Sequence, residues 1–170
     1  HDDPARAVLD GIRQVIAEDA VPAGEIGRVV HATTLFTNAL IERKGARTGL
    51  IATAGFRDIV EIGRERKYEL YDIHIQKPKP LAPRERRLEA VERLRFDGTV
   101  LQPLDEAGVA AAAQALADDG VESIAVAFLH SYANPDHERR AGAIVEANHP
   151  GIAVSLSADV APEIREYERT

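Results

Sequence analysis

Hydrophobic and polar residues repeat along the chain with two periods, one typical of helices and one typical of strands. Asp3 and Pro4 suit the cap and first turn of a helix. Apolar residues at helical spacing follow them, at Val8, Leu9, Ile12, Val15 and Ile16. Similar patterns predict further helices at about residues 34–44, 57–63, 105–120 and 134–147, and another that starts at Pro162.

Short apolar runs between these helices predict strands. They cover residues 28–31, 48–53, 124–129 and 152–156. The Asp97-Gly98 pair lies between Phe96 and Val100, which is a strong signal for a two-residue hairpin with strands on both sides. The pattern over residues 87–94 fits a helix or a strand equally well. Gly45 occupies the position where a left-handed residue would end the helix of residues 34–44.

The order of these elements predicts the fold class. Strands and helices alternate, so we expect an α/β fold with a partly parallel sheet, flanking helices and a hairpin insertion. Residues 1–170 read as one domain with no internal repeat. The stretch 64–102 is the one candidate for an inserted loop or hairpin subdomain. Within it, the Pro-spaced residues 64–84 suggest a surface excursion or a lid-like loop.

Composition excludes several classes of protein. The 170 residues carry a net charge of −7, which argues against a nucleic-acid-binding surface. No apolar run is long enough to span a membrane and no signal peptide is visible, so we expect a cytoplasmic protein. The absence of Cys excludes disulfides, Cys metal sites and thiol nucleophiles. The chain lacks Met and starts at His1, which suggests a segment of a longer protein.

Polar clusters follow four of the predicted strands. They lie at residues 31–34, 53–58, 130–134 and 157–163. Ligands of open α/β sheets bind beyond the carboxyl ends of the strands. If the strands are parallel, all four clusters share one edge of the sheet, and we expect a binding site there.

Each candidate side chain also has a structural interpretation. Thr33, Thr34 and Thr37 can bind a phosphate or a carbonyl group, with Asn38 on the same helical turn. Alternatively, Thr33 or Thr34 simply caps the helix. His130 ends a buried strand and suits either a base or ligand, or a hydrogen-bonded structural role.

Each charged candidate also has two interpretations. Arg57 and Asp58 either pair with each other or line a site. Arg64 is a plausible anion contact or a solvated side chain.

Other motifs are weaker. Asp72 and His74 are too few ligands for a metal site, and none is predicted. His137 with its acidic neighbours, in the first turn of a predicted helix, is explained by the helix dipole. The sequence has no P-loop, no Rossmann glycine fingerprint and no GxSxG motif, and spacing identifies no Ser-His-Asp triad.

Six stretches resemble the N-terminal region of the hydantoinase A/5-oxoprolinase family, which is related to acetone carboxylase subunits. They are HATT at 31–34, TNALIERKG at 37–45, GFRD at 55–58, EIGR at 61–64, HSYANP at 130–135 and PEIREYER at 162–169. They occur in order over nearly the whole chain. The resemblance implies part of the first lobe of an actin-like, ribonuclease H-like ATPase fold. An upstream phosphate loop and a second lobe would lie outside this sequence.

The resemblance also implies a function, namely ATP-dependent opening of a cyclic amide such as a hydantoin or 5-oxoproline. The ring amide would be activated by phosphorylation, with ATP and Mg²⁺ used by the full-length enzyme and neither bound by this fragment alone, which would be inactive. The second lobe and a hydantoinase B-type subunit or domain would be its partners. The catalytic residues stay unknown. The residues expected to line the cleft are His31, Thr33, Thr34, Thr37, Asn38, Arg57, Asp58, Arg64 and His130.

Two departures from the family pattern concern the turn after His31. Ala32 stands where relatives often carry Gly, and Phe36 replaces a smaller residue, so both changes can narrow this turn. Two alternative functions stay open: an ATP-dependent carboxylase subunit of the acetone carboxylase type, and a scaffold domain without catalysis.

Overall fold

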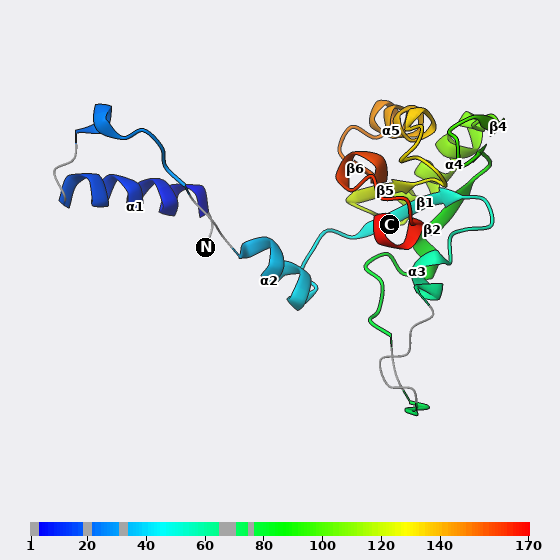
Figure 1. Cartoon of the computed structure of the whole chain (residues 1–170), viewed down its shortest axis with the longest axis horizontal. Helices are drawn as coiled ribbons and strands as arrows, with labels where there is room; N and C mark the ends of the chain where they lie inside the picture. The colour runs from blue at the N-terminus through cyan, green and yellow to red at the C-terminus, as the bar shows by residue number, and fades with distance from the viewer. Residues whose placement is uncertain (1–3, 19–21, 31–33, 65–70, 75–76) are drawn as a thin grey trace. The chain divides into compact units, whose positions relative to one another are not determined.

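The computed structural model describes residues 4–18, 22–30, 34–64, 71–74 and 77–170 (Figure 1). The chain forms two compact units, His1–Glu42 and Arg43–Thr170, and each is described here by itself. Nothing in the described part of the chain forms a helix both long and apolar enough to cross a membrane.

The first unit contains helix α1 (Pro4–Glu18), a short 3-10 helix (Ala23–Glu25) and helix α2 (Leu35–Glu42). One side of α1, Ile26 and residues 28–30 line an apolar groove of about 520 Å³. The predicted strand at 28–31 is wrong for residues 28–30, which form no strand. A strand needs a hydrogen-bonded neighbour, and the described residues of this unit include none. Val29 and Val30 are exposed as a result.

The residue that ends α2 in the left-handed conformation is Arg43, with φ of 52°. The sequence predicts Gly45 for this role, and Gly45 is not among the residues with positive φ. Helix α2 ends at Glu42, so the left-handed position comes two residues earlier than expected.

A four-stranded parallel sheet forms the centre of the second unit (Figure 1). Its strands are β1 (Thr48–Thr53), β2 (Arg87–Ala90), β5 (Ser123–Ala127) and β6 (Ala153–Leu156), in the spatial order β2-β1-β5-β6. All three neighbouring pairs are parallel. The predicted α/β class with a largely parallel sheet is therefore confirmed.

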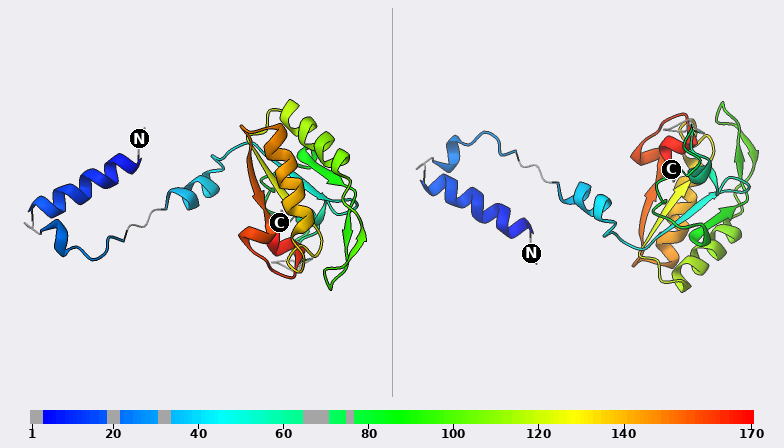
Figure 2. Two further views of the ribbon diagram at one scale, coloured as in Figure 1. Left: turned by 90° about the horizontal axis from the view of Figure 1, so that it is seen from above. Right: turned by 90° about the horizontal axis from the view of Figure 1, so that it is seen from below.

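Two helices, α4 (Glu106–Asp118) and α5 (Asp136–Asn148), pack on each other and on one face of the sheet (Figure 2). The core under them contains Ile51, Val109, Leu116, Ile124, Val126, Phe128 and Val145. A smaller cluster on other residues of the sheet contains Leu50, Ala52 and Ala127, with Ala82 packed against it. Helix α3 (Ile59–Ile62) follows β1 on the way to β2.

Local signals in the sequence predict several boundaries in this unit. The side chain of Asp105 accepts a hydrogen bond from the Gly108 amide and caps α4, as expected. Gly120, with φ of 72°, follows the end of that helix. The predicted hairpin forms between β3 (Arg93–Leu94) and β4 (Val100–Gln102), with Gly98 at φ of 81° in its turn. Arg95 and Thr99 are hydrogen-bonded across it, so the turn has three residues, 96–98, and not the two expected. The ambiguous stretch 87–94 contains two strands, β2 and β3.

The end of the chain differs from the prediction. Helix α6 (Ser157–Val160) precedes Pro162, and helix α7 (Glu166–Arg169) begins four residues after it. The carbonyl of Glu163 accepts a hydrogen bond of 2.7 Å from Arg169 Nη1. In a helix starting at Pro162, a backbone amide would donate a hydrogen bond to this carbonyl. In the structure the side chain of Arg169 donates it instead.

Candidate functional site

The carboxyl ends of all four strands meet at one edge of the sheet, because the strands are parallel. Three of the four polar clusters, at 53–58, 130–134 and 157–163, follow β1, β5 and β6 at this carboxyl edge. The cluster at 31–34 belongs to the first unit, and residues 31–33 lie outside the described residues. Strands β1 and β5 are neighbours at the centre of the sheet. From β1 the chain continues to β2 on one side, and from β5 it continues to β6 on the other side. This is the switch point at which open α/β sheets bind ligands.

Buried polar side chains fill the interior of this edge. Thr53 ends β1 and donates its hydroxyl hydrogen to Glu92 Oε1 in a short hydrogen bond. The other Glu92 oxygen lies 2.8 Å from His137 Nδ1. Thr53 Oγ1 also accepts a 2.9 Å hydrogen bond from the amide of Leu129. All three side chains are less than 5% exposed, so each polar group needs the partner it has.

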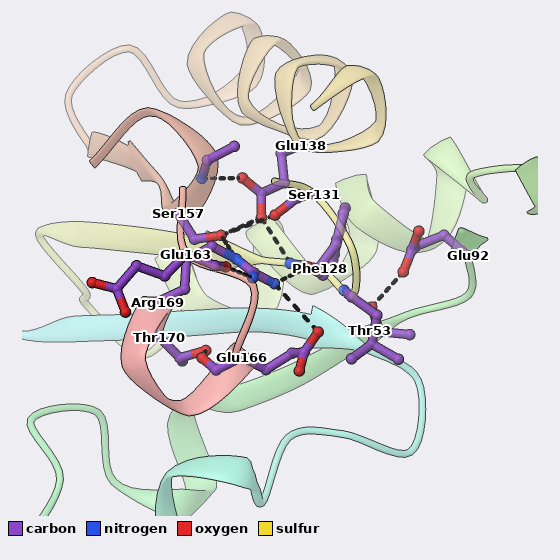
Figure 3. A network of polar contacts seen from close by, with 12 residues as sticks. Thr53, Glu92, Phe128, Ser131, Glu138, Ser157, Glu163, Glu166, Arg169 and Thr170 are labelled. Carbon is purple, nitrogen blue, oxygen red and sulfur yellow. Dashed lines mark hydrogen bonds and ion pairs between the residues drawn. The ribbon is translucent and has the colours of Figure 1, made fainter. Parts of the chain in front are cut away.

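A second buried group lies beside it and includes Glu138, Ser157 and Arg169 (Figure 3). Glu138 Oε1 accepts hydrogen bonds from the Phe128 amide at 2.8 Å and from Ser157 Oγ at 2.6 Å. Arg169 donates to Ser157 Oγ at 2.9 Å and to the Phe128 carbonyl at 2.7 Å. The guanidinium also lies over the ring of Tyr132, 5.8 Å from its centroid. Arg169 thereby holds α7 against the loop that follows β5.

The sequence prediction assigned His137 and its acidic neighbours to the helix dipole. This is wrong for His137 and Glu138, which are buried and hydrogen-bonded across the fold. Their spacing carried a signal, because positions 137 and 138 lie four residues before Ala141 and Gly142 on the buried face of α5. Nothing local in the sequence distinguishes Arg169 from an exposed Arg.

A pocket of about 380 Å³ opens between α3 and α7, and we call it the α3–α7 pocket. Its lining residues are Gly55, Phe56, Asp58, Ile59, Ile62, Gly63, Arg64, Arg165, Glu166, Tyr167 and Glu168. The volume lies within the range of about 300–1,000 Å³ typical of small-molecule sites. Two predicted site residues, Asp58 and Arg64, line this pocket, and two others, Arg57 and His130, do not.

Asp58 is paired with Arg84 and not with its neighbour Arg57. Arg84 donates two hydrogen bonds of 2.9 Å to the two oxygens of Asp58. This hydrogen-bonded pairing lowers the pKa of Asp58 below its ordinary value, and the positive charges of Arg84 and Arg57 add to the effect. Arg57 lies 4.0 Å from Glu89 Oε1. Asp58 therefore lies at the pocket as a carboxylate whose charge is paired with Arg84.

Arg64 forms an ion pair with Glu168 across the pocket, which links α7 to the end of α3. Burial acts to raise the pKa of Glu168, but the hydrogen bond from Arg64 and the charges of Arg64 and Arg165 outweigh it. The pKa of Glu168 lies below its ordinary value as a result. The walls between these charges are apolar and include Phe56, Ile62 and Tyr167. The pocket thus combines apolar walls with charges of both signs, which suits a small ring compound with polar groups.

His130 lies at the carboxyl edge but outside the pocket. It has φ of 58°, and its ring meets Tyr132 edge-on at a centroid distance of 6.0 Å. Its Nδ1 atom is buried and has no hydrogen-bond partner among the described residues. The hydrogen-bonded structural role considered for His130 is therefore not what the structure shows.

The predicted site residues of the first unit lie on or near α2. Asn38 Nδ2 donates a long hydrogen bond of 3.4 Å to Thr34 Oγ1, and Thr37 is exposed. His31 and Thr33 lie outside the described residues. The grouping of these residues with the carboxyl edge stays a prediction.

No group of three or more His, Cys, Asp or Glu side chains suited to a metal ion occurs within the described part of the chain. Asp72 and His74, the weak metal candidates, contact each other through a 2.8 Å hydrogen bond from the His74 amide to Asp72 Oδ1. That contact is a local turn.

Comparison with known proteins gives a family match. Residues 1–149 match the family model for the hydantoinase/oxoprolinase N-terminal region. The chain is 32% identical to the 5-oxoprolinase of Saccharomyces cerevisiae, over 94% of this chain and 15% of that protein.

Two solved structures are similar. The chain matches the crystal structure of an ATP-dependent caprolactamase from Pseudomonas jessenii with a TM-score of 0.82 and 35% identity, over 99% of this chain and 25% of the other. It matches a nucleotide-free acetone carboxylase structure, described under the mechanism of ATP-dependent acetone carboxylation, with a TM-score of 0.70 and 36% identity. That match covers 78% of this chain and 20% of the other. The chain therefore spans a quarter or less of the length of these relatives.

Proposed function

Because the chain belongs to the hydantoinase/oxoprolinase family, we propose that it is part of an ATP-dependent enzyme that opens cyclic amides. The reaction class is activation of the ring amide by phosphorylation, followed by hydrolysis. Phosphorylation turns the amide oxygen into a good leaving group, and positive charge stabilises the charge that develops. The chain contributes residues to the cleft, and by itself it is inactive.

The α3–α7 pocket is the observation that carries this proposal. It lies at the carboxyl edge of a parallel sheet, where such folds bind ligands. Asp58 and Arg64 supply fixed charges, and Phe56 and Tyr167 supply flat apolar surfaces. A cyclic amide has the matching character, since its ring is apolar and its amide group both donates and accepts hydrogen bonds.

ATP and Mg²⁺ belong to the proposed full-length enzyme. Arg64 and Arg165 at the pocket are cations of the kind that bind phosphate groups. Glu166 and Glu168 are each near an Arg, and the described residues contain no cluster suited to a metal. We therefore assign the Mg²⁺ ligands and the phosphate loop to other parts of the longer protein.

The exposed apolar side chains of the first unit support the proposal that this unit packs against a further domain or subunit. Val30, Phe36 and Ile41 are 74–83% exposed, and α1 leaves Leu9 and Val15 more than half exposed. Exposed apolar positions in this number are typical of surfaces that pack against another part of a protein. We propose that residues 1–170 form one domain within the first lobe of an actin-like fold. Within 64–102, β2 belongs to the central sheet, so the inserted parts would be the loop before β2 and the hairpin of β3 and β4. The partners of the domain would be a second lobe and a hydantoinase B-type subunit.

The acetone carboxylase match favours a second candidate function. That structure has a TM-score of 0.70 against this chain, so a similar domain occurs in a protein described under ATP-dependent acetone carboxylation. A carboxylase would activate a ketone or bicarbonate in place of an amide. A scaffold role without catalysis is the third possibility.

One experiment separates the three functions. The longer protein that contains this chain is expressed with its partner subunit and incubated with ATP, Mg²⁺ and a panel of hydantoins, 5-oxoproline, lactams and ketones. We expect ATP consumption that depends on a cyclic amide. Consumption that depends on a ketone and bicarbonate would establish the carboxylase, and no substrate-dependent consumption with any compound would favour the scaffold.

A further inference from the structure

His130 has a backbone conformation that L-amino acids rarely adopt. It lies three residues after the end of β5, at the switch point between β1 and β5. Its φ of 58° is in the left-handed region, and Arg43 is the other non-glycine residue with positive φ in the described part of the chain. Glycine adopts this conformation without strain. Asn, Asp and His adopt it more often than other L-residues, but each still pays a steric cost that glycine avoids.

The turn around His130 is held by its neighbours and not by the imidazole ring. The carbonyl of His130 accepts hydrogen bonds from the amides of Ala133 at 2.9 Å and Asn134 at 3.3 Å. The amide of Leu129 donates to Thr53, and the carbonyl of Phe128 accepts from Arg169. All of these contacts would survive if the side chain of residue 130 were removed. The fold thus accommodates a His at a position where Gly would be less strained.

Within the described part of the chain, the His130 ring makes no hydrogen bond that explains its presence. Nδ1 is buried and has no partner among the described residues, while its ring contact is the edge-on approach to Tyr132. No described residue hydrogen-bonds to Nε2, and Nε2 is not one of the buried unpartnered atoms, so it keeps some exposure to solvent. Strained residues with unused polar groups cluster at functional sites, where the surroundings keep them in place.

We propose that His130 contacts a ligand by donating its Nε2 hydrogen to an oxygen atom, either of a nucleotide phosphate or of the amide carbonyl. A doubly protonated ring would bury a hydrogen on Nδ1 with no acceptor, which is costly. The neutral form with hydrogen on Nε2 leaves only a lone pair unmatched on Nδ1. His130 therefore acts as a neutral hydrogen-bond donor and not as a general base. This assignment rests on the proposed function, because that function supplies the two ligands.

Two substitutions in the longer protein test the assignment. His130→Gly removes the ring and the strain together, so its thermal unfolding temperature should equal or exceed that of the wild type. Its substrate-dependent ATP consumption should fall by about tenfold or more, as expected when a donor to a reacting oxygen is lost. His130→Asn tolerates the same backbone and keeps an N–H donor, so it should retain more turnover than the Gly variant.

Arg43→Gly is the matched control. Arg43 has the same left-handed conformation with φ of 52°, but it lies in an exposed turn. This variant should gain the same relief of strain and keep wild-type turnover. A difference between the two Gly variants then reports the imidazole ring and not the backbone.

Binding measurements identify the source of the oxygen. Calorimetric titrations use MgADP alone and the active cyclic amide alone, with wild type and both His130 variants. Weaker binding of MgADP by the Gly variant assigns the phosphate, and weaker binding of the amide assigns the carbonyl. Wild-type turnover in the Gly variant, or loss of its thermal stability, would overturn the assignment alone. A wild type that binds neither ligand would overturn the proposed function as well.

Discussion

At the scale of single residues, burial separates the polar groups that build the fold from those that face the candidate site. Thr53, Glu92 and His137 are buried at the carboxyl edge and hydrogen-bond to one another. Asp58 and Arg64 line the pocket and keep partial exposure. The same edge of the sheet thus carries a structural interior and a candidate binding surface.

The first residue-scale prediction concerns the buried hydroxyl. Thr53→Val leaves the Leu129 amide and Glu92 Oε1 without these partners, and we expect a loss of about 1–3 kcal/mol in the free energy of unfolding. Thr53→Ser keeps the hydroxyl and should lose about 1 kcal/mol for the missing methyl group. Urea unfolding of the two variants measures the difference. No loss in Thr53→Val beside a loss in Thr53→Ser would mean that the methyl group, and not the hydroxyl, stabilises this edge.

The second residue-scale prediction concerns Asp58 and has a matched control. Asp58→Asn removes a fixed charge from the pocket, and we expect amide-dependent ATP consumption by the longer protein to fall by about tenfold or more. Asp119 forms a similar exposed pair with Arg86, at 2.5 Å, outside the pocket. Asp119→Asn should leave turnover within about twofold of wild type, since exposed ion pairs contribute little to stability. Equal losses in both variants would contradict a role of Asp58 in the site.

At the scale of elements, the position of α7 decides whether the pocket exists. Arg169 holds this short helix to Ser157 and Phe128, and Arg64 pairs with Glu168 on its other side. A four-residue helix has little stability of its own, so these side-chain contacts must hold it in place. The pocket is therefore a product of two Arg contacts and not of the local sequence of α7.

The element-scale prediction is a pH dependence. Arg64 holds the pKa of Glu168 below its ordinary value of 4.5 even though burial acts to raise it. A lowered pKa in the folded state means that ionised Glu168 stabilises the contact above pH of about 4.5, and that this stabilisation is lost as the pH falls through the lowered value. Arg64→Gln removes the positive charge that lowers the pKa of Glu168, while the burial that raises this pKa remains. The titration midpoint of Glu168 should therefore rise. NMR titration of the Glu168 carboxyl carbon measures both midpoints, and identical values would show that Arg64 does not act on Glu168.

At the scale of the whole molecule, the two units differ in how well their apolar side chains are buried. The second unit buries a contiguous core between its sheet and helices α4 and α5. The described residues of the first unit include none classed as buried, and α2 has no buried position. Apolar helices gain most of their stability from packing, so the first unit is expected to need a surface that covers it.

The prediction at this scale uses Ile41, which is 75% exposed on α2. In the 170-residue chain, Ile41→Lys should leave the free energy of unfolding within about 0.5 kcal/mol of wild type. In the longer protein, the same substitution should lower the thermal unfolding temperature by several degrees, because burying an unpaired charge is costly. An unchanged temperature in the longer protein would show that α2 stays exposed there.

The sequence predicted much of the second unit because the relevant signals are local. Asp105 as a cap, the Asp97-Gly98 turn and the apolar runs of β1 and β5 each depend on a few neighbouring residues. The parallel sheet followed from the alternation of strands and helices, and it placed three polar clusters at one edge. The strand at 28–31 failed because a strand also needs a partner, which the pattern of one segment does not reveal.

By itself, then, the sequence determined the long helices and most strands of the second unit, and which polar residues follow the strands. It left residues 87–94 open and misplaced the last helices. The tertiary structure alone decided which polar groups are buried and with what partner. Thr53 meets Glu92 from 39 residues away, and Glu92 meets His137 from 45 residues away. Secondary structure is set by neighbours along the chain, whereas a buried hydrogen bond depends on which distant side chains leave water together.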